Sequence, residues 1–327
     1  MAATADGDLH VYMLNVGQGD TTVIVSPQGN VMVVDAVRPD KLQALLDDLG
    51  LDGTIEHLVI THPHDDHFRG GNRLALDRNI QQATVAPFWH TAGMGPPTYR
   101  RLIAHLSAQT ANVTFLSGYS RWYPDGSTVP VAGTGNHEID PDAPFIELLG
   151  ASTGMVRNLQ DANVFNPNHL SIMGRITWRQ RFRMIIAADA QMENWAAFDE
   201  ARLLEDDCQV LRSAHHGSAN GTQWERIDRL APREVIVSSE PDGRHHLPDL
   251  TGSAIFAKFD SDDGKMAVLT HASGTVHLRV TAGGTRRYEH FGDTKNERVD
   301  LANPTAFDRN ANPTDWPALL DQRVDEL

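Results

Sequence analysis

Four side chains that commonly bind metal ions occur within six residues, directly after an apolar run. His62, His64, Asp66 and His67 form the pattern His-x-His-x-Asp-His. Imidazole and carboxylate groups are ligands for zinc, manganese and iron. His62 and His64 are two residues apart and can point the same way from an extended loop, whereas Asp66 and His67 begin the next turn. We therefore expect a metal site, and the two pairs of ligands predict two ions rather than one.

A solvated polar loop is the alternative interpretation of this segment. Two consecutive glycines, Gly70 and Gly71, follow it and indicate a close approach of another part of the backbone. Four ligands in this order also rarely occur by chance in a chain of this composition. We therefore favour the metal site.

The elements that must position this segment are short strands in the first ninety residues. Runs rich in β-branched residues at 10–16, 21–26 and 31–35 are separated by glycine-containing turns, which predicts an antiparallel meander. Leucines at helical spacing predict a helix over 40–49, and an apolar strand over 55–60 leads directly into the metal segment.

Strands and helices alternate in the rest of the chain. A hairpin is expected over 170–177 and 183–187 and a helix over 191–205, whereas 117–144 has the composition of an irregular insert. Residues 294–327 lack periodicity and are expected to form a tail or a clamp. Two runs of short strands with interspersed helices and no linker predict a single layered α/β domain.

The composition narrows the functional classes. The 327 residues include 28 Lys and Arg against 43 Asp and Glu, a net charge of −15, which argues against a general nucleic-acid coat protein and against an anionic-membrane binder. Cys208 is the single cysteine, so an intramolecular disulfide and a cysteine-built metal site are excluded. No apolar run approaches the length of a membrane span, and the first ten residues lack the features of a secretory signal. We expect a cytoplasmic protein without a membrane partner.

Further motifs surround the metal segment in a fixed order along the chain. They are LNVGQGD at 14–20, VVD at 33–35, ITHPHDDHFRGG at 60–71, IIAADA at 185–190, AHHGS at 214–218 and, more weakly, GRHHLP at 243–248. In their order and spacing these motifs resemble those of metallo-β-lactamase-fold hydrolases. Within that superfamily the chain is similar to the competence-type, ComEC-like branch, typified by the hydrolase domain of the DNA-uptake channel protein ComEC. The resemblance implies a four-layer αββα sandwich, with a single hydrolase domain over 1–293.

The resemblance also implies how two ions would share their ligands. His62 and His64 would hold the first ion, and Asp66 and His67 would hold the second. Asp189 would bridge the two ions.

The remaining ligand positions each have two candidates. His216 directly precedes Gly217 and is the expected last ligand of the second ion, which leaves His215 to face the substrate. The third ligand of the first ion is either His169 or a water molecule, and we favour His169. Asp35 is expected to accept the second N–H of a ligating histidine.

The function that the resemblance implies is a dinuclear metal-dependent hydrolase of the phosphodiesterase or nuclease type. Two divalent ions, zinc in the first place and manganese in the second, would share a hydroxide that attacks the substrate. Asp66 would orient that hydroxide, and His215 or His246 would protonate the leaving oxygen. The expected substrate is a phosphodiester, either a small molecule or short or single-stranded DNA.

Two alternatives stay open at this point. The same site could hydrolyse the carbonyl group of a lactone, a thioester or a β-lactam. The chain could also be a non-catalytic metal-binding module, although its complete ligand set argues against this. Long DNA would require a cleft that gathers Arg175, Arg212 and Arg244, because a net charge of −15 repels a polyanion.

Overall fold

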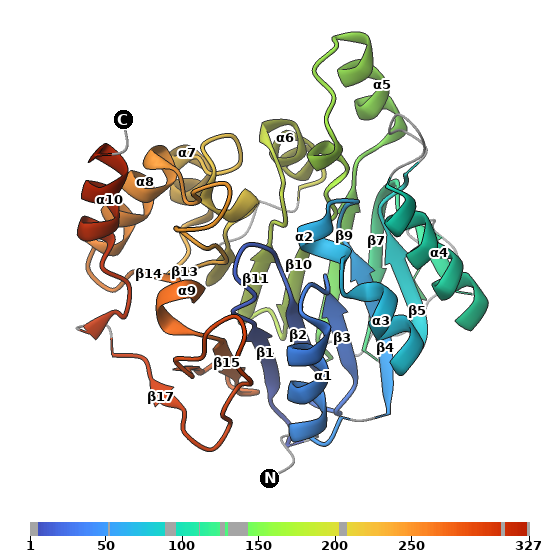
Figure 1. The fold of residues 1–327 in the computed structure, drawn as a ribbon, viewed down its shortest axis with the longest axis horizontal. Coiled ribbons are helices and arrows are strands. Elements are labelled where there is room, and N and C mark those ends of the chain that lie inside the picture. The colour runs from blue at the N-terminus through green and yellow to red at the C-terminus, as the bar shows by residue number, and fades with distance from the viewer. Residues whose placement is uncertain are drawn as a thin grey trace.

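Two β-sheets stack face to face at the centre of the molecule, and helices cover both outer faces (Figure 1). The computed structural model describes residues 6–51, 53–88, 96–110, 112–124, 128–129, 143–202, 208–308 and 311–325.

The first sheet contains the N-terminal strands. Its strands β1, β2 and β3 form the predicted antiparallel meander, and β3, β4 and β5 run parallel. Two strands from the C-terminal third, β15 and β16, return to pair beside β1. In spatial order the strands are β17 (Thr305–Ala306), β16 (Arg286–His290), β15 (Val276–Val280), β1 (Leu9–Met13), β2 (Thr22–Val25), β3 (Val31–Val34), β4 (Thr54–Ile60), β5 (Asn79–Val85) and β6 (Val113–Phe115).

The second sheet contains the predicted hairpin, formed by β10 and β11, and a parallel run from β11 to β14. The prediction of an irregular insert is wrong for residues 118–122, which form β7 and pair with β9 because Trp122 is buried in the core between the sheets. Residues 125–127 and 130–142 of that insert lie outside the described residues. In spatial order the strands are β14 (Met266–Leu269), β13 (Glu234–Val237), β12 (Val210–Arg212), β11 (Phe182–Ile186), β10 (Met173–Trp178), β9 (Phe145–Gly150), β7 (Gly118–Trp122) and β8 (Thr128–Val129).

Apolar side chains point alternately to the two faces of a strand, so both faces of each sheet must be buried. Along β1, Val11 and Met13 join the core between the two sheets, whereas Tyr12 joins the core under the helices. A strand that is apolar on both faces is stable only when both faces are buried. The result is the expected four-layer αββα sandwich in a single domain.

The helices divide between the two outer faces. No helix in the described part of the chain combines the length and the hydropathy that a membrane span requires. The helix expected over 191–205 ends at Glu200. The first sheet is covered by α1 (Pro39–Asp48), α3 (Gly71–Asp77) and α4 (Pro97–Gln109), and the second by α6 (Met192–Glu200), α7 (Trp224–Leu230), α8 (Leu250–Asp260) and α10 (Trp316–Asp325).

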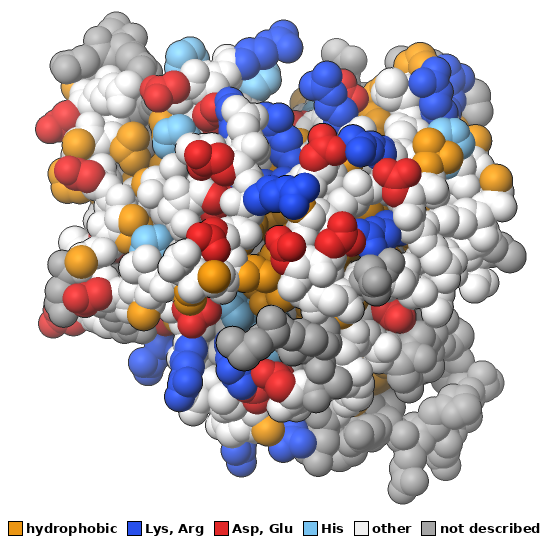
Figure 2. Space-filling model, turned by 60° about the horizontal axis from the view of Figure 1, so that its bottom comes forward, with side chains coloured by type: hydrophobic (Ala, Val, Ile, Leu, Met, Phe, Trp, Pro, Cys, Tyr) orange, Lys and Arg blue, Asp and Glu red, His pale blue; other side chains and the backbone are white. Residues whose placement is uncertain are grey.

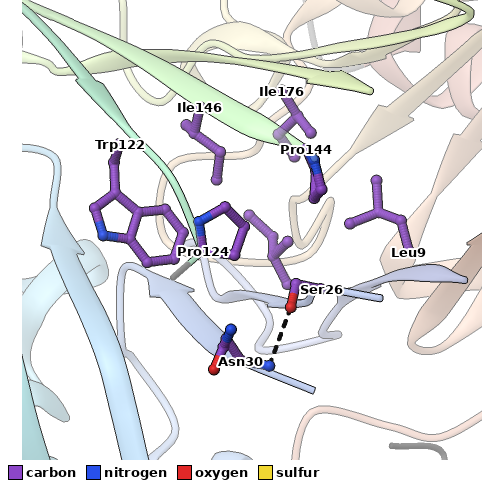
Figure 3. A pocket seen from close by; sticks show the side chains of 9 residues that line it. Leu9, Ser26, Asn30, Trp122, Pro124, Pro144, Ile146 and Ile176 are labelled. Carbon is purple, nitrogen blue, oxygen red and sulfur yellow. Dashed lines mark hydrogen bonds between the residues drawn. The ribbon is translucent and has the colours of Figure 1, made fainter. Parts of the chain in front are cut away.

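A small apolar pocket lies between the sheets, at the end where β2 turns into β3 (Figure 3). The Ser26 hydroxyl accepts a hydrogen bond from the backbone N–H of Asn30 at its rim, at 3.1 Å. Leu9 and Ile24 line it from the first sheet, and Trp122, Ile146 and Ile176 line it from the second. Because these walls are apolar, we assign the pocket to packing between the sheets.

The C-terminal segment packs tightly on the second sheet. Trp316 is fully buried, its ring lies 5.1 Å from that of Phe256, and its indole N–H donates a hydrogen bond to the Ala267 carbonyl at 2.8 Å. This packing supports the proposal that residues 294–327 form a clamp on the domain over 1–293.

We predict that Trp316→Ala lowers the free energy of unfolding by about 3–5 kcal/mol, because it empties a large buried site. Urea unfolding followed by circular dichroism measures the change. Val324→Ala, on the same helix but at an exposed position, should change the free energy by less than about 0.5 kcal/mol. Equal effects of the two variants would show that the segment is not a clamp.

A buried histidine should make the fold sensitive to acid. His57 on β4 is buried against Trp122, and burial lowers its pKa to about 3. An unfolded chain binds a proton at this residue below about pH 6.5, and the folded chain does not, so acidification between about pH 6.5 and 3 favours unfolding. When the pH falls from 7 to 5, the free energy of unfolding of the parent protein should fall because of this residue. We predict that the fall is about 2 kcal/mol smaller in His57→Gln. Urea unfolding at both pH values tests this, with the exposed His271→Gln as the control that should behave like the parent.

Candidate metal centre

The predicted ligands come from the ends of strands in both sheets. From the first sheet, β4 leads into the loop with His62 and His64 and then into the short helix α2 (Asp65–Phe68). From the second sheet, β11 precedes Asp189, and β12 precedes the 3-10 turn η2 (Ala214–Gly217). Both halves of the sandwich therefore contribute to one cluster, held on rigid elements.

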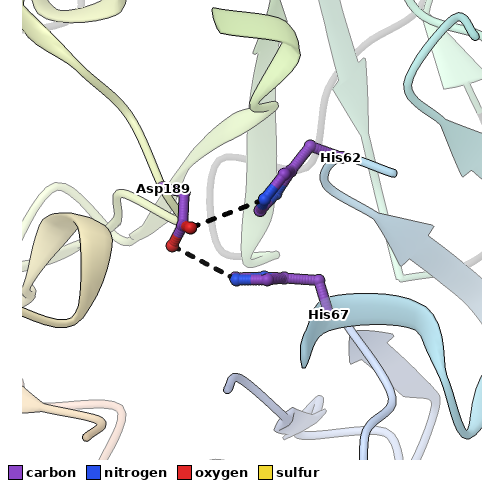
Figure 4. Close-up of side chains that lie close together, drawn as sticks. All are labelled: His62, His67 and Asp189. Atoms are coloured by element: carbon purple, nitrogen blue, oxygen red, sulfur yellow. Dashed lines mark ion pairs between the residues drawn. The ribbon is translucent and has the colours of Figure 1, made fainter. Parts of the chain in front are cut away.

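Asp189 lies at the centre of this cluster (Figure 4). Its Oδ2 atom is 3.5 Å from Nε2 of His62, and its Oδ1 atom is 3.2 Å from Nε2 of His67. The same Oδ1 atom is 3.3 Å from Nε2 of His216. All four side chains are buried.

The hydrogen bonds of two histidines direct their free nitrogen atoms into the cluster. Nδ1 of His67 donates to Oδ2 of Asp35 at 2.7 Å, and Nδ1 of His216 donates to the carbonyl oxygen of Ser238 at 2.8 Å. Carboxylate and carbonyl oxygens only accept, so in each ring Nε2 is the nitrogen that can bind a metal ion once it carries no proton. These two Nε2 atoms lie only 3.4 Å apart. Asp35 thus holds His67 as the sequence analysis expected.

Two atoms of the cluster lack a hydrogen-bond partner. Nε2 of His62 and Oδ1 of Asp189 are buried and make no hydrogen bond with any residue that the structure describes. Such groups are rare in folded proteins because leaving them unpaired is costly. A divalent cation would give both atoms a partner, and nitrogen and oxygen donors of this kind suit zinc. The residues therefore fit the metal ions that the sequence implies.

The electrostatics of the cluster also suit a cation. Burial lowers the pKa of His62 and of His64 to about 4, so neither ring competes for a proton at neutral pH. Burial would raise the pKa of Asp189, but His216 and His67 outweigh it and hold the pKa well below its usual range. Burial would likewise lower the pKa of His67, but Asp189 and Asp35 raise it well above its usual range. The cluster thus keeps a buried negative charge that attracts positive charge, in the form of a proton or a metal ion.

The cluster contains two neighbouring sets of ligand atoms, each within 4.8 Å. One set is His62, His67 and Asp189, and the other is Asp66, His67 and His216. His64 is half-buried, packs edge-on against His62 at 4.8 Å between ring centroids, and lines the open chamber beside Asp189.

The N-terminal VGQGD motif supports this cluster through its backbone. The backbone N–H of Asp20 donates to the carbonyl oxygen of Asp66 at 3.0 Å. Gly19 has a φ of 128°, and a Cβ atom there would lie 2.4 Å from that same carbonyl oxygen, so no other residue fits. The Asp20 carboxylate accepts from the fully buried Arg212 at 2.8 Å. The motif is thus a structural support, and Arg212 is not a substrate-binding group.

His169 is not brought into the cluster. Its Nδ1 accepts a hydrogen bond from the backbone N–H of Asn166 at 3.0 Å, within the capping box of the 3-10 turn η1 (Pro167–Leu170). Its Nε2 lies 3.2 Å from the Glu193 carboxylate and donates to it. Both ring nitrogens are therefore engaged elsewhere. The preceding residue, Asn168, lines the chamber instead, and its buried Oδ1 has no hydrogen-bond partner among the described residues.

Of the adjacent residues His245 and His246, the structure places His245 at the chamber, whereas the sequence analysis expected His246. His246 is exposed, has a left-handed backbone (φ 49°) and does not line the chamber, whereas His245 does. His215 lines the chamber as expected, with Nδ1 2.6 Å from Oδ1 of Asn220 and Nε2 3.0 Å from Nδ2 of Asn168. The sequence offered no signal for choosing His245, since two neighbouring histidines are distinguished only by the local backbone.

The three arginines that binding of long DNA would require do not gather in one cleft. Arg175 pairs with the buried Glu147 at 2.6 Å on the second sheet, and Arg212 lies under the cluster as described above. Arg244 alone of the three lines a groove beside the cluster.

Comparisons with known proteins place these features in a family. The family model of the metallo-beta-lactamase superfamily matches residues 14–179, which is 166 of the 327 residues. A search of curated proteins finds no match. Solved structures similar to this chain include a metallo hydrolase from the archaeon Ignicoccus hospitalis (12% identity, 82% of this chain and 98% of that chain, TM-score 0.46), an isothiocyanate hydrolase from Delia radicum gut bacteria (9%, 81% and 98%, TM-score 0.46) and a mutant metallo-beta-lactamase from Cronobacter sakazakii (16%, 68% and 81%, TM-score 0.36).

Proposed function

The chain belongs to the metallo-beta-lactamase superfamily, and from this premise we propose that it is a dinuclear metal-dependent hydrolase that cleaves phosphodiesters. The observation that carries the proposal is the convergence of three histidine Nε2 atoms, that of His62 without a hydrogen-bond partner among the described residues, on a buried, ionised Asp189. The VGQGD and HHGS motifs support placing the chain in the competence-type, ComEC-like branch, and therefore favour phosphodiesters. We propose zinc as the first candidate metal and manganese as the second.

The ligand set that we propose keeps the division that the resemblance implies. When bound there, divalent ions would supply Lewis acidity and make a water molecule more acidic. Asn168 replaces His169 as the candidate for completing the first set, because its Oδ1 is buried without a hydrogen-bond partner among the described residues and the residue lines the chamber. The set comprises His62, His64, Asn168 and Asp189 on one side, and Asp66, His67 and His216 on the other, with Asp189 shared.

Several side chains around the chamber can donate or accept protons and bind water. Burial would raise the pKa of Asp66, but His67 and His216 lower it, so Asp66 is ionised and can accept a hydrogen bond from the attacking water. His215 faces Asp189 at 3.7 Å and is oriented by Asn168 and Asn220, so it can protonate the leaving oxygen. His245 takes the place proposed for His246, because it lines the chamber and His246 does not.

A panel of substrates tests this proposal. Protein loaded with manganese or zinc should hydrolyse bis(p-nitrophenyl) phosphate and short single-stranded DNA, and His64→Ala or Asp66→Ala should abolish both activities. The panel includes a lactone, a thioester and a chromogenic β-lactam. Hydrolysis of one of these carbonyl substrates with every phosphodiester left intact would replace the phosphoryl assignment by the carbonyl alternative. No hydrolysis of any substrate by metal-loaded protein would favour a non-catalytic module.

A further inference from the structure

A groove continues from the metal-centre chamber over the helix α2 and the start of α1. The chamber has a volume of about 730 Å³ and the groove about 870 Å³. They share four lining residues, so a bound molecule can extend from one into the other. These residues are Gln18, Asp65, Asp66 and His245.

The charge of the lining differs between the two spaces. The chamber is lined by aspartates and, among the described residues, by no lysine or arginine. The groove is lined by four acidic side chains and by five cationic ones: Arg38, Lys41, Arg69, Arg244 and Lys295. Figure 2 likewise shows basic and acidic side chains intermixed on one face of the molecule.

Two of these five cations are already neutralised within the protein. Lys41 forms a buried ion pair with Asp293, and Lys295 pairs with Glu240. Of the groove's acidic residues, Asp40 pairs with Arg73, outside the groove.

The other three cations have no acidic partner. Arg38, Arg69 and Arg244 make no ion pair with any residue that the structure describes. Arg38 is half-buried and its Nε is 3.5 Å from the Val16 carbonyl oxygen, whereas Arg69 and Arg244 are exposed. In a chain with a net charge of −15, three such guanidinium groups in one groove require an explanation.

We infer that the groove binds a second phosphate of the substrate, outside the bond that is cleaved, through Arg38, Arg69 and Arg244. Guanidinium groups present paired donors that match phosphate oxygens, and they stay charged at every physiological pH. This inference rests on the proposed function, since it assumes that the scissile bond lies at the cluster.

Binding of small nucleotides tests the inference without requiring turnover. Thymidine 5′-monophosphate, thymidine 5′-diphosphate and thymidine 3′,5′-bisphosphate are titrated by calorimetry into manganese-loaded protein at low salt. At least one of the two-phosphate probes should bind about tenfold more tightly than the monophosphate, as three charge-assisted contacts of about twofold to fivefold each allow. The diphosphate and the bisphosphate distinguish a phosphate joined directly to the first from one separated by a nucleoside.

The preference for two phosphates should depend on the three arginines. In the triple variant Arg38→Gln, Arg69→Gln, Arg244→Gln, the preference should fall to about twofold or less. Arg157→Gln, an exposed arginine on α5 (Thr153–Asp161) that lines neither space, should keep it. Equal affinities of all three probes for the parent protein, or an unchanged preference in the triple variant, would overturn the inference.

The outcome is separable from that of the proposed function. A preference that depends on the arginines, without hydrolysis of any phosphodiester, would leave the phosphate site standing and reject the phosphodiesterase. Hydrolysis of phosphodiesters without the preference would leave the phosphodiesterase standing and reject the phosphate site.

Discussion

Asp189→Asn should lower kcat toward bis(p-nitrophenyl) phosphate by about a thousandfold and weaken the retention of metal. The substitution keeps the shape of the side chain but removes the negative charge that lies within 3.5 Å of His62, His67 and His216. Loss of one preorganised electrostatic group in an active site typically costs a hundredfold to a thousandfold, and this group also serves both candidate ligand sets. Steady-state kinetics at saturating manganese, together with metal analysis after dialysis, measures the two effects.

Asp65→Asn provides the matched control for metal content. Asp65 lies on the short helix α2, beside Asp66, and lines the chamber, but it is exposed and belongs to neither set of ligand atoms. This variant should keep the metal content of the parent protein. A stoichiometry of one ion per chain in the metal-saturated parent protein, together with full activity of Asp189→Asn, would reject the dinuclear centre.

His216→Ala should lose one metal equivalent per chain, whereas His215→Ala should keep both and lose rate. The two adjacent rings differ in what their nitrogens contact. His216 presents an Nε2 lone pair to Asp189, because its Nδ1 donates to the Ser238 carbonyl. His215 instead has one nitrogen at Asn220 and the other at Asn168, on the wall of the chamber.

Metal analysis by mass spectrometry distinguishes these outcomes, and near-ultraviolet circular dichroism establishes that both variants are folded. We expect about a hundredfold loss of kcat for His215→Ala, within the range of lost general acid catalysis. Loss of a metal equivalent in His215→Ala and its retention in His216→Ala would reverse the two roles.

The layered fold could be predicted from the sequence because its signals are local. Short runs rich in β-branched residues between glycine-containing turns predicted the meander, and leucines at helical spacing predicted α1. The loop after β4 could be located because its potential ligands are neighbours in sequence. β7 was missed because it lies in a segment rich in turn residues and is fixed by the burial of Trp122.

The outer parts of the site could not be predicted, because backbone geometry and distant contacts determine them. The side chain of His169 caps the backbone at Asn166, and the sequence alone does not indicate this arrangement. The groove arginines are more than a hundred residues apart at the widest gap, from Arg69 to Arg244, and no periodicity connects them. Arg212 differs from Arg244 only in that a buried carboxylate, Asp20, pairs with it.

The pairing of β1 with β15 has a consequence for how the chain is made. Leu9 lies opposite Val280. One edge of the buried strand β1 therefore stays unpaired until the far end of the chain has been synthesised. At a synthesis rate of about 5–20 residues per second, that partner emerges roughly 15–50 seconds after β1. During this interval the nascent chain presents an apolar strand edge that can pair with another polypeptide. Chaperones that hold nascent chains should therefore raise the soluble yield of this protein, and truncated chains that end before Val276 should aggregate.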